Sequence, residues 1–150
     1  MDDSRLADRA ALLGRGWLFA ECTDGELERI AALTEARRVP AGQVILREGD
    51  PGGEFFVVVD GHSEVSVDGQ RVAEIGPGSF FGEMALLDGG ERVATVTART
   101  DLDVLVLHRE EFNEMLAMAM PTLAPKLLSV VGRRVRELEA RRGTGVPFGA

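Results

Sequence analysis

Two short runs, separated by four residues, decide the fold of this chain: Phe81-Gly82-Glu83-Met84-Ala85-Leu86-Leu87 and Arg92-Val93-Ala94-Thr95-Val96. They place one carboxylate, Glu83, and one guanidinium, Arg92, on either side of a short apolar turn. Gly82 has no Cβ, so the backbone can come close to a ligand there. The turn that follows is expected to point N–H groups at an anion, and Arg92 has the planar fork that suits a phosphate. The runs predict a site for a small ligand with a vicinal hydroxyl and a single negative charge.

The same residues resemble the phosphate-binding cassette of the cyclic nucleotide-binding domain family, found in catabolite-activator-type regulators, cyclic-nucleotide-dependent kinases and gated channels. The family pattern is F-G-E-φ-A-L-φ, a short spacer and R-x-A-T/x-V, and this chain reads FGEMALLDGGERVATV over 81–96. The resemblance implies that Glu83 binds the ribose 2′-hydroxyl and Arg92 the cyclic phosphate. Gly82, Met84 and Ala85 complete the implied binding cassette. Glu91 departs from kinase-type members, which usually have proline there, and we interpret it as a subfamily difference.

The resemblance also implies which nucleotide binds. Family members that prefer cGMP often have Thr where this chain has Val93, and valine offers the guanine no hydroxyl. We therefore expect cAMP as the ligand, with cGMP less favoured. Val65 and Ile75 align with positions that wall the base and ribose, although both also suit an ordinary barrel core. Leu138 stands where the catabolite activator uses a hydroxyl residue, and it is expected to cover the base by apolar contact.

Composition and charge narrow the class of protein. The chain has 150 residues, 45% of them hydrophobic and 28% charged, as in a soluble globular domain. The net charge is −8, and residues 126–142 carry +4, which leaves −12 for the rest. An acidic body repels nucleic acid, so no DNA partner is expected. No membrane span or secretory signal is predicted, and the lone Cys22 agrees with a cytoplasmic location.

The sequence does not indicate a catalytic or metal-binding site. There is no serine nucleophile elbow, no Walker loop and no dinucleotide fingerprint, so no enzyme activity is predicted. His62 and His108 form no H-x-H pair, whereas a metal-binding cupin barrel needs several histidines and a carboxylate around one ion. No metal is therefore expected.

The pattern along the chain predicts a mainly β domain, an antiparallel jelly-roll barrel with N-terminal helices and two C-terminal helices. Helices are expected over 4–13 and from 24 to about 35, with Thr23 as N-cap and Glu26 completing a capping box. Short β-branched runs divided by glycine turns fill 39–108, and Asp68-Gly69 is a strong hairpin signal. The expected strand runs are 44–46, 55–59, 64–67, 71–75, 93–98 and 103–107.

The remaining sequence predicts two helices, at 109–119 and from Pro121 to about 142, because Pro121 breaks the first and opens the second. A single domain of 1–150 is expected, with N-terminal helices in 1–38, the barrel in 39–108, C-terminal helices in 109–142 and a frayed tail in 143–150. The last helix carries an apolar stripe suited to a dimer seam or a lid: Leu127, Val131, Val135 and Leu138.

Three functions remain open at this point. The favoured one is a stand-alone cyclic nucleotide sensor that moves its C-terminal helices and acts through an unknown effector protein or a homodimer. The second is a structural or partner-binding module with a vestigial pocket. The third, a transcription factor of the same family, would need about 60–80 further residues for a helix-turn-helix module.

Overall fold

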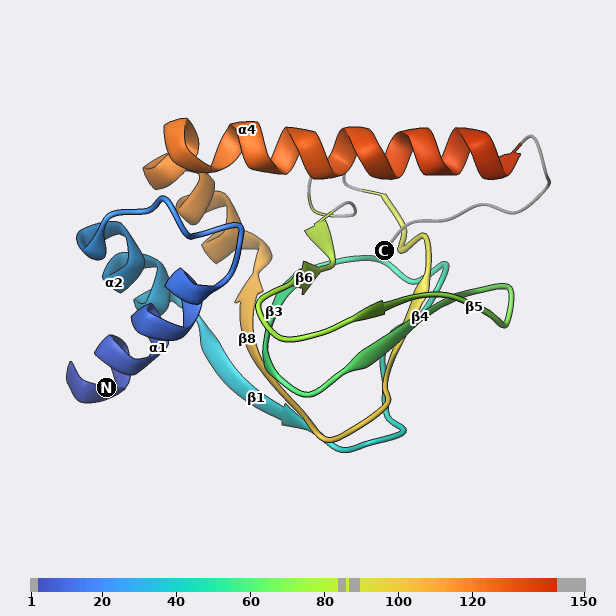
Figure 1. Cartoon of the computed structure of the whole chain (residues 1–150), viewed down its shortest axis with the longest axis horizontal. Coiled ribbons are helices and arrows are strands. Elements are labelled where there is room, and N and C mark those ends of the chain that lie inside the picture. The colour runs from blue at the N-terminus through green and yellow to red at the C-terminus, as the bar shows by residue number, and fades with distance from the viewer. Residues whose placement is uncertain (1–2, 84–85, 87–89, 143–150) are drawn as a thin grey trace.

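The computed structural model describes residues 3–83, 86 and 90–142, with side chains described for 7–83, 86, 90–133 and 136. Figure 1 shows a β barrel flanked by two N-terminal helices, with a long C-terminal helix lying across one end. The elements are α1 (Asp3–Arg15), α2 (Asp24–Leu33), β1 (Glu35–Val39), β2 (Val44–Leu46), β3 (Glu54–Asp60), β4 (Ser63–Val67), β5 (Gln70–Ile75), β6 (Phe80–Phe81), β7 (Thr95–Ala98), β8 (Leu102–His108) and α4 (Arg109–Arg142).

The strands form two four-stranded antiparallel sheets, ordered β1-β8-β3-β6 and β2-β7-β4-β5. One apolar core lies between the sheets and includes Phe56, Phe81 and Val106, each fully buried. A second core joins the outer face of the first sheet to the helices and includes Phe55, Phe112 and Leu123. The alternation of side chains along β3 thus serves both cores, because neighbouring residues point to opposite faces. The predicted antiparallel, jelly-roll-like arrangement with N-terminal helices is confirmed, whereas the description as mainly β is not, because the described helices contain more residues than the strands.

Local signals for the turn and the helix cap also proved reliable. Asp68 and Gly69 both have positive φ, 52° and 79°, and join β4 to β5 as a tight hairpin. Thr23 caps α2: its Oγ1 accepts from the Glu26 N–H at 3.1 Å, and the Glu26 side chain accepts from the Thr23 N–H at 2.9 Å. Both orphan donors are satisfied as a capping box requires.

The sequence patterns did not predict two of the observed strands, β1 and β6. Strand β1, Glu35–Val39, occupies a segment that we expected to be the end of a helix followed by a turn. Among its five residues only Val39 is buried, because β1 lies at the edge of its sheet and pairs with β8 on one side. Strand β6 consists of Phe80 and Phe81 alone, too short for any alternation to show.

The C-terminal region corrects a prediction. Instead of two helices, it is one long helix, α4, interrupted at Ala119, which has non-helical φ and ψ of −119° and 24°. Pro121 follows two residues later, where a missing N–H is tolerated at the restart of a helix. Leu127, the first residue of the stripe predicted as a dimer seam or a lid, is buried in the core against the sheet and helices. Met120 and Leu128 are large apolar side chains of α4 that are exposed.

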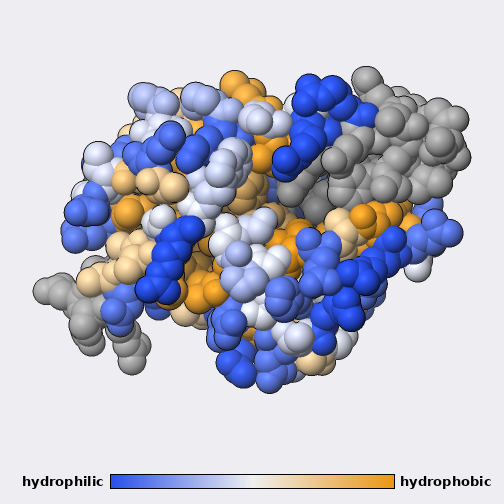
Figure 2. Space-filling view, viewed as in Figure 1, coloured by the Kyte–Doolittle hydropathy of each residue, from blue (hydrophilic) through white to orange (hydrophobic). Residues whose placement is uncertain are grey.

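Part of α4, Arg109–Arg133, is long and apolar enough to span a membrane by length and composition alone. The sequence patterns had not indicated this. A mostly buried core helix passes the same test; in this stretch Phe112, Met115 and Leu123 are fully buried, and 28% of the window is buried within the domain. In Figure 2 the visible face carries hydrophilic side chains over β4 and β5, with apolar side chains scattered between them.

Candidate functional site

The candidate site begins at Gly82, directly after β6. Gly82 has a φ of 95°, and a Cβ built there would lie 2.7 Å from the Glu54 carbonyl oxygen and 3.1 Å from Nη1 of Arg92. The sequence predicted that glycine permits close approach of a ligand. In the structure the close approach is to the chain itself, because the missing Cβ leaves room for the guanidinium.

Glu83, the predicted ribose-binding carboxylate, is fully buried. Glu83 and Leu86 both have helical backbone conformation, which agrees with the predicted short turn after Gly82. A carboxylate at the start of a helical turn lies in a favourable field from the N–H dipoles. Met84 and Ala85, also predicted to contact the ligand, lie outside the described residues.

Arg92, the predicted phosphate-binding residue, is 6% exposed and is held against the same turn. Its Nη1 donates to the Gly82 carbonyl and its Nη2 to the Glu54 carbonyl, each at 2.8 Å. A guanidinium has five N–H donors, so these two bonds orient the fork without using all of it. The structure therefore brings Arg92 to Gly82, the residue adjacent to Glu83.

The backbone of Arg92 is fixed as firmly as its side chain. Its N–H donates to the Asp50 carbonyl and its carbonyl accepts from the Gly49 N–H, both at 2.8 Å. Pro51 and Glu91 form an isolated antiparallel bridge beside them. The loop between β2 and β3 thus holds the backbone of Arg92 in place, a role that the sequence did not predict.

The electrostatics of the site favour an anion. Burial lowers the pKa of Arg92, and the nearby positive charge of Arg109 lowers it further, whereas Glu54 opposes both. The pKa of an arginine guanidinium is ordinarily so far above neutral that the group stays charged at neutral pH even when this pKa is lowered. The two side-chain hydrogen bonds that orient this buried cation go to neutral carbonyl oxygens. An anionic ligand would compensate its charge.

The other predicted site residues occupy different environments. Val65 and Ile75 are buried, at 1% and 7% exposure, in the core between the two sheets, and Val93 is half-buried beside Arg92. Their position as barrel core is observed, whereas a wall for the base is still a prediction. Leu138 belongs to α4, but its side chain lies outside the described part of the structure.

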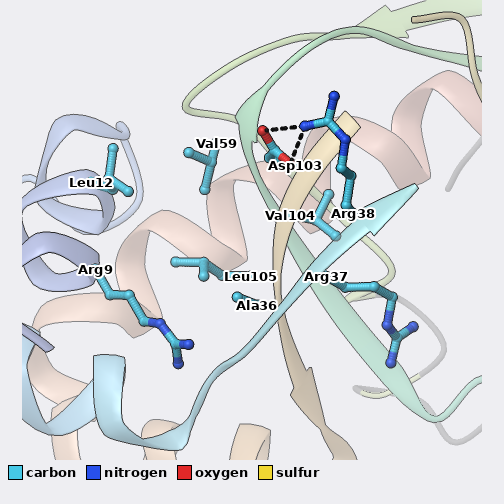
Figure 3. Close-up of a pocket in the computed structure, with 9 residues that line it drawn as sticks. All are labelled: Arg9, Leu12, Ala36, Arg37, Arg38, Val59, Asp103, Val104 and Leu105. Carbon is cyan, nitrogen blue, oxygen red and sulfur yellow. Dashed lines mark hydrogen bonds and ion pairs between the residues drawn. The ribbon is translucent and has the colours of Figure 1, made fainter. Parts of the chain in front are cut away.

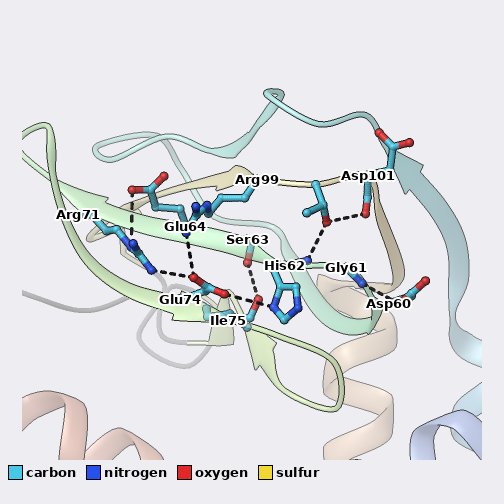
Figure 4. A network of polar contacts seen from close by, with 11 residues as sticks. Asp60, Gly61, His62, Ser63, Glu64, Arg71, Glu74, Ile75, Arg99 and Asp101 are labelled. Atoms are coloured by element: carbon cyan, nitrogen blue, oxygen red, sulfur yellow. Dashed lines mark hydrogen bonds and ion pairs between the residues drawn. The ribbon is translucent and has the colours of Figure 1, made fainter.

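Charged clusters flank the barrel on two sides. Figure 4 shows the first, where Glu74 accepts from Arg71 at 2.7 Å and from Arg99 at 3.0 Å and lies 3.3 Å from His62. The second joins Arg37 to Glu35 and Glu54, and His108 to the same two carboxylates. Among the described residues no group of three or more His, Cys, Asp or Glu side chains is placed to hold a metal ion.

Comparison with known proteins identifies the family. The family model described as "Cyclic nucleotide-binding domain" matches residues 36–118. The chain belongs to the cyclic nucleotide-binding domain family. A cyclic nucleotide-gated potassium channel, mll3241, from Mesorhizobium japonicum is 46% identical over 107 residues, covering 71% of this chain and 29% of the channel. The cyclic AMP receptor protein of Thermus thermophilus is 33% identical over 127 residues, covering 81% of this chain and 58% of that protein.

Solved structures of this family share the fold. The crystal structure of the Thermus thermophilus catabolite activator protein matches with a TM-score of 0.73 and 32% identity, covering 85% of this chain and 62% of that one. A kinase regulatory domain described as "Sp-2Cl-cAMPS bound to PKAR CBD2" matches with a TM-score of 0.74 and 25% identity, covering 86% and 92%. The chain thus spans less than two thirds of the length of the channel and of the receptor protein.

Proposed function

We propose that this cyclic nucleotide-binding domain binds cAMP reversibly and without catalysis, as a sensor. The observation that carries the proposal is the buried guanidinium of Arg92, which donates to the carbonyls of Gly82 and Glu54 while two backbone hydrogen bonds to Gly49 and Asp50 fix the residue itself. A cyclic phosphate is a monoanion that would compensate this charge, and the remaining N–H donors of a guanidinium can grip it in parallel. Glu83 then supplies an acceptor for the ribose 2′-hydroxyl.

The choice of cAMP rests on Val93 and on the relatives. Valine at this position offers no hydroxyl to a guanine amino group, which removes a contact that would favour cGMP. The names of a receptor protein and of kinase regulatory subunits among the relatives specify cyclic AMP. Val65 and Ile75 would contact the nucleotide from the barrel, and Leu138 of α4 would cover the base.

The proposed output is a shift of α4 against the barrel. A ligand changes such an equilibrium only through its different affinities for the two arrangements. The helix is interrupted at Ala119, and this break is the point at which its second half would change direction. The signal would then pass to an effector protein or to a second copy bound through the last helix, in the cytoplasm.

Calorimetric titration of the purified chain with cAMP and cGMP tests the proposal. Wild type should bind cAMP at one site, and Arg92→Ala should lose about 2–5 kcal/mol, roughly 30-fold or more in affinity. Arg99→Ala is the matched control, because Arg99 is a half-exposed arginine paired with Glu74 on the barrel surface. Equal affinities in wild type and Arg92→Ala would refute the assigned pocket. Absence of binding to the folded wild type would favour the partner-binding module with a vestigial pocket.

A further inference from the structure

A second pocket lies between α1 and the outer face of sheet β1-β8-β3-β6. Its volume is about 430 Å³, within the range of about 300–1,000 Å³ that small-molecule sites occupy. Figure 3 shows α1 on one side of the pocket and β1, β3 and β8 on the other. None of the residues that line it belongs to the 81–96 cassette.

The middle of the pocket is apolar. Ala36 of β1 is paired with Leu105 of β8, and side chains of an antiparallel pair share a face. Val59 of β3 and Leu12 of α1 complete this apolar surface and are both half-buried (Figure 3). A hydrocarbon group placed here would remove their remaining apolar surface from water, which is favourable in proportion to the area covered.

The arginines Arg38 and Arg9, which line the pocket, differ in whether a carboxylate compensates their charge. Arg38 is paired with Asp103 at 3.1 Å and with Asp101 at 3.3 Å, so its charge is already compensated. Arg9, on α1, donates from Nη1 to the backbone carbonyl of Thr34 at 2.9 Å, and no carboxylate among the described residues pairs with it. The Arg9 side chain extends along the pocket below Leu105 (Figure 3). One end of an apolar cavity therefore offers a half-buried cation that is hydrogen-bonded to a neutral oxygen.

We propose that this pocket binds a small aliphatic monocarboxylate, with the hydrocarbon chain over Leu105 and Val59 and the carboxylate on Arg9. A guanidinium and a carboxylate form two parallel charged hydrogen bonds, stronger than those between neutral groups. Arg38 and Asp103 close the opposite end with a compensated pair, which disfavours a second charge on the ligand. The site is independent of the cassette, so this inference stands apart from cAMP binding.

Octanoate, used below its micellar concentration, is a suitable probe for the full chain. 1-Octanol, an uncharged analogue of the same chain length, is the control. We expect saturable one-site binding by calorimetry, with amide shifts in nuclear magnetic resonance spectra at Ala36 and Leu105. Octanol should bind about tenfold more weakly, because it cannot form the charged hydrogen bonds. Equal affinity for the two probes, or binding that does not saturate, would overturn the proposal.

Variants locate the site. Arg9→Gln should weaken octanoate binding about tenfold or more. Arg15→Gln, at the exposed last residue of the same helix, should leave it unchanged. Ala36→Phe, a change at an exposed position that fills the pocket, should abolish binding even if Arg9→Gln fails to fold. Wild-type octanoate affinity in Ala36→Phe would overturn the assignment.

A final experiment measures octanoate binding in the presence of saturating cAMP. Octanoate affinity should persist in its presence, because the two sites share no lining residue. Displacement of octanoate by cAMP would place the fatty acid in the cassette and would overturn the separate site.

Discussion

The carbonyl oxygen of Gly82 accepts a 2.8 Å hydrogen bond from Nη1 of Arg92, so the residue before Glu83 is joined directly to the predicted phosphate-binding group. The absence of a side chain at position 82 leaves room for this bond. A Cβ there would lie 3.1 Å from Nη1 and 2.7 Å from the Glu54 carbonyl oxygen. The glycine of the cassette thus fits the close packing of the folded site, independently of any ligand.

Gly82→Ala should therefore lower the free energy of unfolding by more than the strain of a positive φ alone would. The left-handed backbone costs an alanine about 1–2 kcal/mol, and the contact with Glu54 adds to this because backbone atoms cannot move aside cheaply. Gly42→Ala is the control, because Gly42 has a φ of 89° and a Cβ added there would meet nothing within 4 Å. Urea unfolding should show a larger loss for Gly82→Ala, with weaker cAMP binding as well. Equal losses would mean that the crowding at Gly82 is relieved by movement.

Val93→Thr tests the basis of nucleotide selectivity. Val93 is half-buried beside Arg92, and a threonine there has nearly the same shape with a hydroxyl in place of one methyl group. We expect cAMP affinity to change little and cGMP affinity to rise by about tenfold, the value of one good hydrogen bond in a partly dry site. Paired titrations with both nucleotides would measure the ratio. An unchanged ratio of cAMP to cGMP affinity would show that Val93 does not determine nucleotide selectivity.

Thr23→Ala should lower the unfolding free energy by about 1 kcal/mol, because it removes the N-cap of α2. The capping box is reciprocal, so Thr23→Ala and Glu26→Ala together should cost less than the sum of the two single changes. A double-mutant cycle by urea unfolding gives this coupling. Strict additivity would show that the two hydrogen bonds form independently of each other.

The reliable sequence predictions were those with local causes. Asp68-Gly69 specified a hairpin because the turn needs positive φ at both residues, and Thr23 specified a cap because its hydroxyl reaches a nearby N–H. Strand β1 was missed because its sequence, Glu-Ala-Arg-Arg-Val, has almost no apolar signal at a sheet edge. Its partner β8 lies more than sixty residues away, beyond the reach of any local pattern.

The positions of the two main candidate residues follow from a local motif as well, whereas their contacts with a ligand are still a prediction. The cassette motif places Glu83 and Arg92 near one turn, and the structure buries both. The support from Glu54 and Asp50 could not be predicted, because both contribute backbone carbonyl oxygens to Arg92 and every residue has one. Pro121 indicated a break close to Ala119, where the backbone is non-helical, but it did not show that α4 continues as one element beyond that point.

Acid should weaken the domain partly through Glu35. Hydrogen bonds from His108 and then Arg37 hold the pKa of the Glu35 carboxyl below its usual 4.5. The folded state therefore favours the ionised form, so Glu35 adds stability above pH 4.5, and this is lost as the pH falls through the lower folded-state pKa. Glu35→Gln should flatten the fall in unfolding free energy as the pH drops below about 4.5.

The effect of Glu35 should be modest, because its side chain is 50% exposed and water screens the pair. Glu28→Gln, at an exposed position of α2, is the matched control for loss of a surface carboxylate. Urea unfolding across this pH range gives the slopes for all three proteins. Identical slopes in wild type and Glu35→Gln would contradict the assigned role of this carboxylate.

Trp17 can report whether α4 moves when the nucleotide binds. It is the only tryptophan of the chain, and the ammonium of Lys126, on α4, lies 5.3 Å from its ring centroid. Lys126 also donates to the Trp17 carbonyl at 2.6 Å, so α4 is tied to the segment between α1 and α2. A cation over an indole changes its electronic environment, and a shift of α4 would alter that contact.

Saturating cAMP should therefore change the emission of Trp17 in wild type. In Lys126→Met the starting emission should differ and the response to cAMP should be smaller, because the cation is gone while the apolar stem remains. Calorimetry on the same samples establishes that both proteins bind the nucleotide. Binding with unchanged emission in wild type would mean that α4 keeps its contact with Trp17, and a shift confined to the helix beyond Lys126 would then be the remaining route for the signal.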